Sequence, residues 1–299
     1  MPRPLAAPRQ ASLHGHLAML AFSALVAGSF SLGAMAAPYV DPAALTTLRF
    51  VIASVIVGTA ALTTNGFSRC AFAAPWRYLI LGGLLAIYFV LMFEGLKTAA
   101  PVSTAAVFTL TPLLAAGFGW ILLRQRTTPR MALALTIGAA GAAWVIFRAD
   151  WQALMGFHIG GGEMIYFWGC VCHAVYAPMV RKLNRGESAV VFSFGTMVAG
   201  TLVLALWAWP ALCATNWAAM PPIVWITLAY VSVAASAATF VLLQYASLRL
   251  PSAKVMAYTY LTPSWVILWE IALGRGVPPV GVLAGIAMTI LALYLLLEE

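Results

Sequence analysis

The chain has 299 residues, of which 63% are hydrophobic and only 8% are charged, and its formal net charge is +8 at pH 7. This composition excludes a soluble globular domain, in which about 25% of residues are charged, and indicates an integral membrane protein. Because one bilayer span needs about 20 apolar residues, the hydrophobic pattern predicts ten spans joined by short loops, near residues 13–35, 43–64, 77–97, 101–123, 128–148, 160–182, 188–209, 221–246, 251–273 and 278–297.

The positive charge gathers on one side of these predicted spans. With the N-terminus inside, the outer loops hold only Lys97, Arg148 and Arg275. The inner loops and the N-terminal tail hold the larger group: Arg3, Arg9, Arg69, Arg77, Arg124, Arg126, Arg130, Arg181, Lys182, Arg185 and Arg249. The positive-inside rule explains this excess, so the net charge gives no reason to predict nucleic-acid binding.

The first predicted span also has features of a signal peptide, because Arg3 and Arg9 precede an apolar run that ends in small residues at 34–36. The run is longer than a usual signal core and has a counterpart at 160–182, so we expect it to be retained as a span. Cys170 and Cys172 should point apart on one helix. Cys70 and Cys213 should lie on opposite sides of the membrane, so no disulfide is expected.

The fourth and ninth predicted spans carry the same interruption. Residues 106–112 read AVFTLTP and residues 257–263 read AYTYLTP, so four of seven positions match and both runs place a Thr-Pro pair within an apolar segment. Paired breaks of this kind point to a binding site in secondary transporters. The alternative is that two apolar helices resemble each other by chance.

The similarity continues outside the breaks, because residues 88–97 align with residues 240–249. The chain then divides into a first repeat at 1–150 and a second at 151–299, each with five spans. Since five is odd, the second repeat enters the membrane from the opposite side. The sequence therefore predicts an all-α membrane protein built from two inverted-topology five-helix repeats, which meet near the bilayer midplane.

These features resemble the drug/metabolite transporter superfamily, in its ten-span EamA-type branch. The resemblance covers the whole chain and is carried by Pro42 and Arg49-Phe50 in span two, by the two Thr-Pro segments and by the short loops. It implies that both termini are cytoplasmic and that spans one to four and six to nine surround a central cavity. Within the superfamily the chain is most similar to the YddG-type exporters of aromatic and other neutral amino acids, which implies a multi-pass protein of a bacterial inner membrane.

Each mid-span proline removes a backbone donor, so Pro112 should free the carbonyl of Phe108 and Pro263 that of Thr259. The hydroxyls of Thr111 and Thr262 lie beside these breaks. We expect the two breaks to form bent gates and walls of the binding site; a kink that serves packing alone is the alternative.

Span six has a polar face at helical spacing, formed by Glu163, Tyr166, Cys170, His173 and Ala177, with Tyr176 beside it. His173 falls near mid-membrane, where ionisable groups are rare and usually functional. It could hydrogen-bond a substrate carboxylate or accept a proton, or it could be a neutral histidine bonded to a neighbouring helix.

Arg49 lies about 9 Å into span two at 1.5 Å per residue. It could bind a substrate carboxylate, pair with Glu163 or Glu270, or extend to the membrane interface. Glu163, His173 and Glu270 leave proton exchange open, and a uniporter driven by the solute gradient is equally compatible with the sequence.

Aromatic residues that fall deep within the spans suit an apolar or aromatic cargo, although ordinary helix packing is the alternative for any one of them. They are Tyr88, Trp168, Tyr176, Tyr245, Tyr258, Tyr260 and Trp265. Small residues form faces on span five, at Ala134, Gly138 and Gly141, and on span ten, at Gly281 and Gly285. These faces could pack against the rest of the bundle or form a homodimer.

No phosphate-binding loop, catalytic carboxylate cluster or serine nucleophile with its base is recognisable, so no enzyme activity, metal or cofactor is predicted. The sequence favours a carrier that exports small metabolites, with neutral and aromatic amino acids as preferred cargo, by alternating access around a midplane cavity. Three alternatives are an exporter of lipophilic cations, a nucleotide-sugar or phosphate exchanger, and an intramembrane enzyme or receptor that transports nothing.

Overall fold

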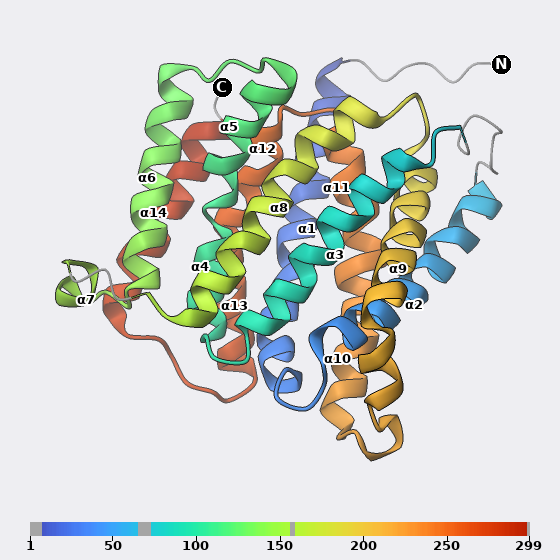
Figure 1. The fold of residues 1–299 in the computed structure, drawn as a ribbon. Coiled ribbons are helices and arrows are strands. Elements are labelled where there is room, and N and C mark those ends of the chain that lie inside the picture. The colour runs from blue at the N-terminus through green and yellow to red at the C-terminus, as the bar shows by residue number, and fades with distance from the viewer. Residues whose placement is uncertain (1–7, 65–72, 156–158, 298–299) are drawn as a thin grey trace.

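The computed structural model describes residues 8–64, 73–155 and 159–297, with side chains of the first helix from residue 12 onward. All regular structure in these ranges is helical (Figure 1). The elements are α1 (Pro8–Ala36), α2 (Pro42–Thr64), α3 (Trp76–Gly95), α4 (Pro101–Phe108), α5 (Thr111–Leu123), α6 (Pro129–Ile146), α7 (Trp151–Met155), α8 (Gly161–Leu183), α9 (Ala189–Ala214), the 3₁₀ turn η2 (Trp217–Ala219), α10 (Pro222–Ser232), the π-helical turn η3 (Val233–Ala238), α11 (Thr239–Ser247), α12 (Ser252–Ala257), the 3₁₀ turn η4 (Tyr258–Leu261), α13 (Thr262–Ala272) and α14 (Val280–Leu297).

Eight helical segments in the described part of the chain are long and apolar enough to cross a membrane. They are α1 from Ser12, α2, α3, α4 with α5, α6, α9, α10 through α11, and α14. Helices also lie at the two remaining predicted positions, as α8 and as α12 through α13. Both contain charged residues, which lower their apolarity, and both carry side chains that the sequence singled out as functional.

The contacts between helices are nearly symmetric between the two halves of the chain. For most helix pairs, the helices at the equivalent positions in the opposite halves also pack together. The helix α6 packs along α14, and α2 packs along α9. The helix α3 packs along α8, and its exchanged counterpart is the packing of α1 along α10 and α11 (Figure 1). The helix α1 begins and α14 ends at the same end of the bundle.

Pairs of glycines bring the backbones of three helix pairs close together: α3 with α9, α3 with α8, and α6 with α14. A Cβ on Gly82 of α3 would lie 2.4 Å from the backbone of Gly200 of α9, and one on Gly95 would lie 2.6 Å from the carbonyl of Gly162 of α8. The small faces of the fifth and tenth predicted spans also pack against each other, because a Cβ on Gly141 would lie 2.6 Å from the carbonyl of Gly285. Helix association in lipid depends on such close packing rather than on the hydrophobic effect.

Both predicted breaks are present. The fourth span is interrupted between α4 and α5, where residues 109 and 110 form a turn, and the ninth is interrupted by η4. Pro112 and Pro263 each lie in the first turn of the helix that follows the break, where a missing backbone N–H costs least. Each break therefore begins a new helix segment.

Candidate functional site

A cluster of buried aromatic rings surrounds His173 of α8. The imidazole stacks on Tyr88 of α3 with ring centroids 4.5 Å apart, and the ring of Phe108 of α4 lies 5.2 Å away. Tyr176 and Phe22 stack more loosely, at 6.3 and 6.4 Å. We call Phe22, Tyr88, Phe108, Tyr166, His173 and Tyr176 the central cluster; all six are buried.

Hydrogen bonds connect the central cluster to neighbouring helices. The hydroxyls of Tyr88 and Tyr166 lie 3.0 Å apart. The amide of Gln244, on α11, donates to the hydroxyl of Tyr176 at 2.8 Å. Gln244 was absent from the residues predicted for the site, although a glutamine within an apolar span was a visible signal. The residues of the predicted polar face of span six, Glu163, Tyr166, Cys170, His173 and Ala177, are all buried, and their role in binding stays a prediction.

The two Thr-Pro breaks satisfy their freed carbonyls differently. The hydroxyl of Thr111 donates a hydrogen bond to the carbonyl of Phe108, which is the carbonyl that Pro112 leaves unpaired. In the second break the backbone N–H of Thr262 reaches the carbonyl of Thr259 through the 3₁₀ turn. The hydroxyl of Thr262 consequently has no partner among the described residues.

Buried polar atoms without a hydrogen-bond partner within the described residues occur on many of the helices. Among them are five from residues already discussed: His173 Nδ1, Gln244 Oε1, Thr259 Oγ1, Thr262 Oγ1 and Arg49 Nη1. Each unsatisfied buried polar atom costs about 1–3 kcal/mol, so such atoms gather where a ligand or water completes the hydrogen bonding. Aromatic faces together with unpaired donors and acceptors suit a small molecule that has both polar groups and an apolar part.

Arg49 of α2 is completely buried, so the interpretation in which it extends to the membrane interface is wrong. Its guanidinium donates to the hydroxyl of Ser236 and, at 2.5 Å, to the carbonyl of Ala235, and it lies 3.6 Å above the ring of Phe89. The carbonyl is presented by the π-helical turn η3, a local structure that frequently occurs at functional sites. The predicted pairing of Arg49 with Glu163 or Glu270 is not formed.

Glu163 and Glu270 contact other residues instead. Glu163, in the first turn of α8, accepts a hydrogen bond of 2.7 Å from Ser103 and lines a pocket of about 310 Å³ with Arg148. Glu270 approaches Arg275 at 3.9 Å. Neither carboxylate forms part of the central cluster.

The other aromatic residues predicted for the site lie in different surroundings. Trp168 is 59% exposed, so its assignment to the site is wrong; it lies on a face of α8 that the bundle does not cover. The ring of Tyr245 contacts Arg249, whose guanidinium lies 3.4 Å above it. Two others contact α1: the hydroxyl of Tyr258 lies 3.1 Å from His16 Nδ1, and the indole of Trp265 donates to Ser23 at 3.2 Å.

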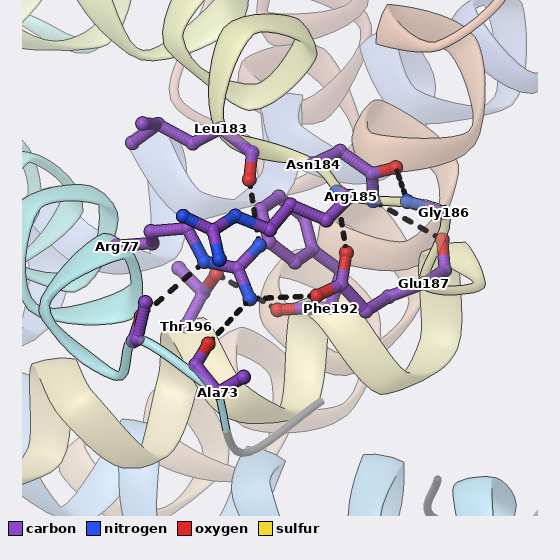
Figure 2. A network of polar contacts seen from close by, with 10 residues as sticks. Ala73, Arg77, Leu183, Asn184, Arg185, Gly186, Glu187, Phe192 and Thr196 are labelled. Atoms are coloured by element: carbon purple, nitrogen blue, oxygen red, sulfur yellow. Dashed lines mark hydrogen bonds and ion pairs between the residues drawn. The ribbon is translucent and has the colours of Figure 1, made fainter. Parts of the chain in front are cut away.

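A buried ion pair that the sequence did not reveal joins α3 to the loop between α8 and α9. Arg77 Nη2 lies 2.7 Å from Glu187 Oε1, and the two side chains are 1% and 2% exposed (Figure 2). Arg77 also donates to the carbonyls of Leu183 at 2.7 Å and Ala73 at 2.9 Å. Assigned from sequence to the basic inner surface, Arg77 is instead part of the packed structure.

Burial raises the pKa of the Glu187 carboxyl, but hydrogen bonds from Arg77 and from the backbone N–H of Arg185 outweigh it, so the pKa is held below its ordinary value. The cysteines Cys170, Cys172 and Cys213 are free, and Cys70 lies outside the described residues. In the described part of the chain, His, Cys, Asp and Glu form no group of three or more that could hold a metal ion.

The described chain is a bundle of apolar helices with breaks at both Thr-Pro pairs, and the first break contributes Phe108 to the buried aromatic cluster. These features are typical of a membrane transporter. The sequence model of the EamA-like transporter family matches residues 13–147 and again residues 161–298, and the chain belongs to this family.

One relative is the uncharacterized transporter YyaM of Bacillus subtilis (strain 168), which is 27% identical over 194 residues. That alignment covers 64% of this chain and 64% of the relative, so the chain matches slightly less than two thirds of the relative's length. A solved crystal structure of another protein superposes with a TM-score of 0.72 over 96% of each chain at 21% identity, a likeness of fold alone.

Proposed function

We propose that this chain is a secondary transporter that exports small metabolites, with neutral amino acids, including aromatic ones, as its cargo. Its membrane domain has ten spans arranged as two inverted five-helix repeats, 1–150 and 151–299. Two observations support this arrangement. The family model matches once in each half, and helices at equivalent positions in the two halves make equivalent contacts.

The proposed orientation places both termini in the cytoplasm of a bacterial cell whose inner membrane holds the protein. Support comes from the ends of the helices. Arg124, Arg181 and Lys182 follow or end α5 and α8 at the end of the bundle where α1 begins and α14 ends. Positive charge at one end of the spans is typical of the cytoplasmic side.

The observation that carries the cargo proposal is the coincidence of stacked aromatic rings with unpaired buried polar atoms. Tyr88, Phe108 and Tyr176 offer aromatic faces for an apolar or aromatic side chain. His173 Nδ1 and Arg49 Nη1 are unpaired groups that suit a carboxylate. A zwitterionic amino acid also needs an acceptor for its ammonium group, and the hydroxyl oxygens of Thr259 and Thr262 can accept hydrogen bonds.

The alternating-access step uses the two breaks as bent gates. The helices α5 and α13 begin at Thr111 and Thr262, each with a proline as its second residue, so each can tilt relative to the segment before it while few backbone hydrogen bonds change. In the described conformation the central cluster is closed, because its six residues are buried. Tilting of α5 and α13 would expose it to one side of the membrane at a time.

Counterflow in proteoliposomes tests the function directly. Proteoliposomes that contain the purified protein and are preloaded with unlabelled solute should accumulate labelled phenylalanine, leucine or alanine. The variant Tyr88→Ala should reduce this uptake at least about tenfold. Trp168→Ala is the matched control, because that ring is exposed on the outside of the bundle. Uptake of a lipophilic cation or a phosphorylated solute, with no uptake of any amino acid, would contradict the proposed cargo. An equal loss of uptake in Tyr88→Ala and Trp168→Ala would contradict the central cluster as the binding site.

A further inference from the structure

A second pocket lies away from the central cluster, at the end of the bundle where the basic residues gather. It has a volume of about 210 Å³ and lies between the end of α5, the start of α6, the end of α8 and the start of α12. Its wall includes Ala116, Gln125, Arg126, Met131, Arg181 and Ala253. The pocket thus joins the α5–α6 connection of the first half of the chain to α8 and α12 of the second half.

The polar part of this pocket is strongly basic. Arg126 and Arg181 are exposed, and neither has an acidic partner among the described residues. Gln125 also lines the pocket, and its Nε2 is buried and without a hydrogen-bond partner in the part of the chain that the structure describes. Two guanidinium groups and a free amide N–H are the donors that a phosphate ester binds.

The rest of the wall is apolar and reaches into the spans. Ala116 belongs to α5 and Met131 to α6, and both of these helices are apolar enough to cross a membrane. The pocket wall therefore combines basic side chains at the helix ends with apolar residues that lie within the helices. A soluble anion would fill only its basic end, whereas a phospholipid presents a phosphate and a hydrocarbon chain at the required separation.

The position of Gln125 connects the pocket to the broken spans. Arg124 ends α5 in a left-handed conformation, with φ of 55°, which turns the chain so that the Gln125 carboxamide lies against Gly119. Gln125 Oε1 accepts a hydrogen bond of 3.2 Å from the backbone N–H of Ser252 in α12. The same side chain thus bridges one segment of each broken span and borders the pocket.

We propose that this pocket binds the phosphate headgroup of an anionic phospholipid, with Arg126 and Arg181 as the charged contacts and Gln125 Nε2 as a further donor. Basic pockets between helices on the cytoplasmic side of membrane proteins recognise such headgroups. The proposal concerns a lipid site that is independent of the transported cargo.

Native mass spectrometry of the detergent-purified full chain tests the proposal. Phosphatidylglycerol should bind at least about tenfold more tightly than phosphatidylcholine of the same acyl chains, because each basic group near an anionic lipid contributes roughly a fivefold gain in affinity. The double variant Arg126→Gln/Arg181→Gln should lose that preference. The matched control Lys182→Gln/Arg249→Gln removes two charges from the same end of the bundle, outside the pocket, and should keep it.

Retention of the preference in the Arg126→Gln/Arg181→Gln variant would overturn the proposal, and so would equal loss in the control, which would indicate unspecific attraction to basic charge. A third arm adds inorganic phosphate or glycerol 3-phosphate. Tight binding of inorganic phosphate or glycerol 3-phosphate, with no preference among lipids, would assign the pocket to a soluble anion. That result would overturn the proposal of a lipid site. All variants should melt within a few degrees of the parent, because the substituted side chains are exposed.

Discussion

His173 and Tyr88 stack within the membrane-spanning region, with ring centroids 4.5 Å apart and planes inclined by 23°. One residue belongs to α8 and the other to α3, so the contact joins the two halves of the chain at the centre of the buried cluster. The stacking satisfies the ring faces of His173, but it leaves Nδ1 without a hydrogen-bond partner in the described structure. A mutation of His173 can therefore distinguish a role of its ring in packing from a role of its nitrogen in binding a solute.

Replacing His173 with phenylalanine should keep the ring contact and remove the ring nitrogen. We expect His173→Phe and His173→Ala both to reduce amino-acid counterflow at least about tenfold, while His173→Phe retains normal expression and melting temperature. The measurements are uptake in proteoliposomes and thermal unfolding in detergent. Normal uptake by His173→Phe would confine His173 to packing.

The two Thr-Pro breaks predict an asymmetry between Thr111 and Thr262. Thr111→Val removes the hydroxyl that caps the Phe108 carbonyl, so the free energy of unfolding should fall by about 1 kcal/mol. Thr262→Val removes a hydroxyl that has no partner in the described structure, so stability should be unchanged while transport falls. Thermal unfolding with parallel uptake assays distinguishes the two. A larger loss of stability in Thr262→Val would contradict the assignment of the caps.

Adjacent glycines in α3 provide a matched test of helix packing. A Cβ on Gly82 would lie 2.4 Å from the backbone nitrogen of Gly200 and 2.6 Å from the carbonyl of Thr196, whereas a Cβ on Gly83 would have no atom within 4 Å. Gly82→Ala must therefore push α3 away from α9 and should destabilise the protein by about 1–3 kcal/mol. Gly83→Ala should be neutral or should stabilise the helix by up to about 1 kcal/mol. Melting temperatures in detergent measure both, and equal shifts would argue against the close contact.

Much of the helical organisation could be predicted because the apolar pattern and the prolines are local signals. The Thr-Pro segments predicted both breaks and the carbonyl that Pro112 frees, since the effect of proline on the preceding turn depends on covalent geometry alone. The spacing of Tyr166, Cys170 and His173 likewise predicted that they share one face of α8, and all three are buried in the structure. These inferences needed no knowledge of which helices are neighbours.

The partners of polar residues could not be predicted in this way. A pairing of Arg49 with Glu163 or Glu270 was one of three alternatives, but its partners are the hydroxyl of Ser236 and a carbonyl that the π-helical turn η3 presents. That turn has no recognisable sequence signal, and side-chain pairing across the bundle depends on helix rotation. Trp168 failed for the same reason: its depth was inferred from position along the helix, but its direction depends on where α3 packs.

The ion pair between Arg77 and Glu187 predicts a specific dependence of stability on pH. Because the pKa of Glu187 is lower in the folded protein than its ordinary value of 4.5, the pair stabilises the fold at pH values above about 4.5. This contribution is lost as the pH falls through the lowered pKa and the carboxylate takes up a proton. The melting temperature of the parent protein should fall on acidification in that range.

Glu187→Gln should remove this part of the acid sensitivity and should lower stability at pH 7 by about 3 kcal/mol, because Arg77 remains buried without its counter-charge. Glu94→Gln is the control: Glu94 pairs with Lys97 at 2.7 Å, but those side chains are 42% and 35% exposed, so the loss should stay below about 1 kcal/mol. Melting curves of the three proteins between pH 3 and pH 8 provide the comparison. Parallel pH profiles for Glu187→Gln and the parent would show that the pair does not hold α3 to the loop between α8 and α9. That contact would then depend on the hydrogen bonds from Arg77 to backbone carbonyls alone.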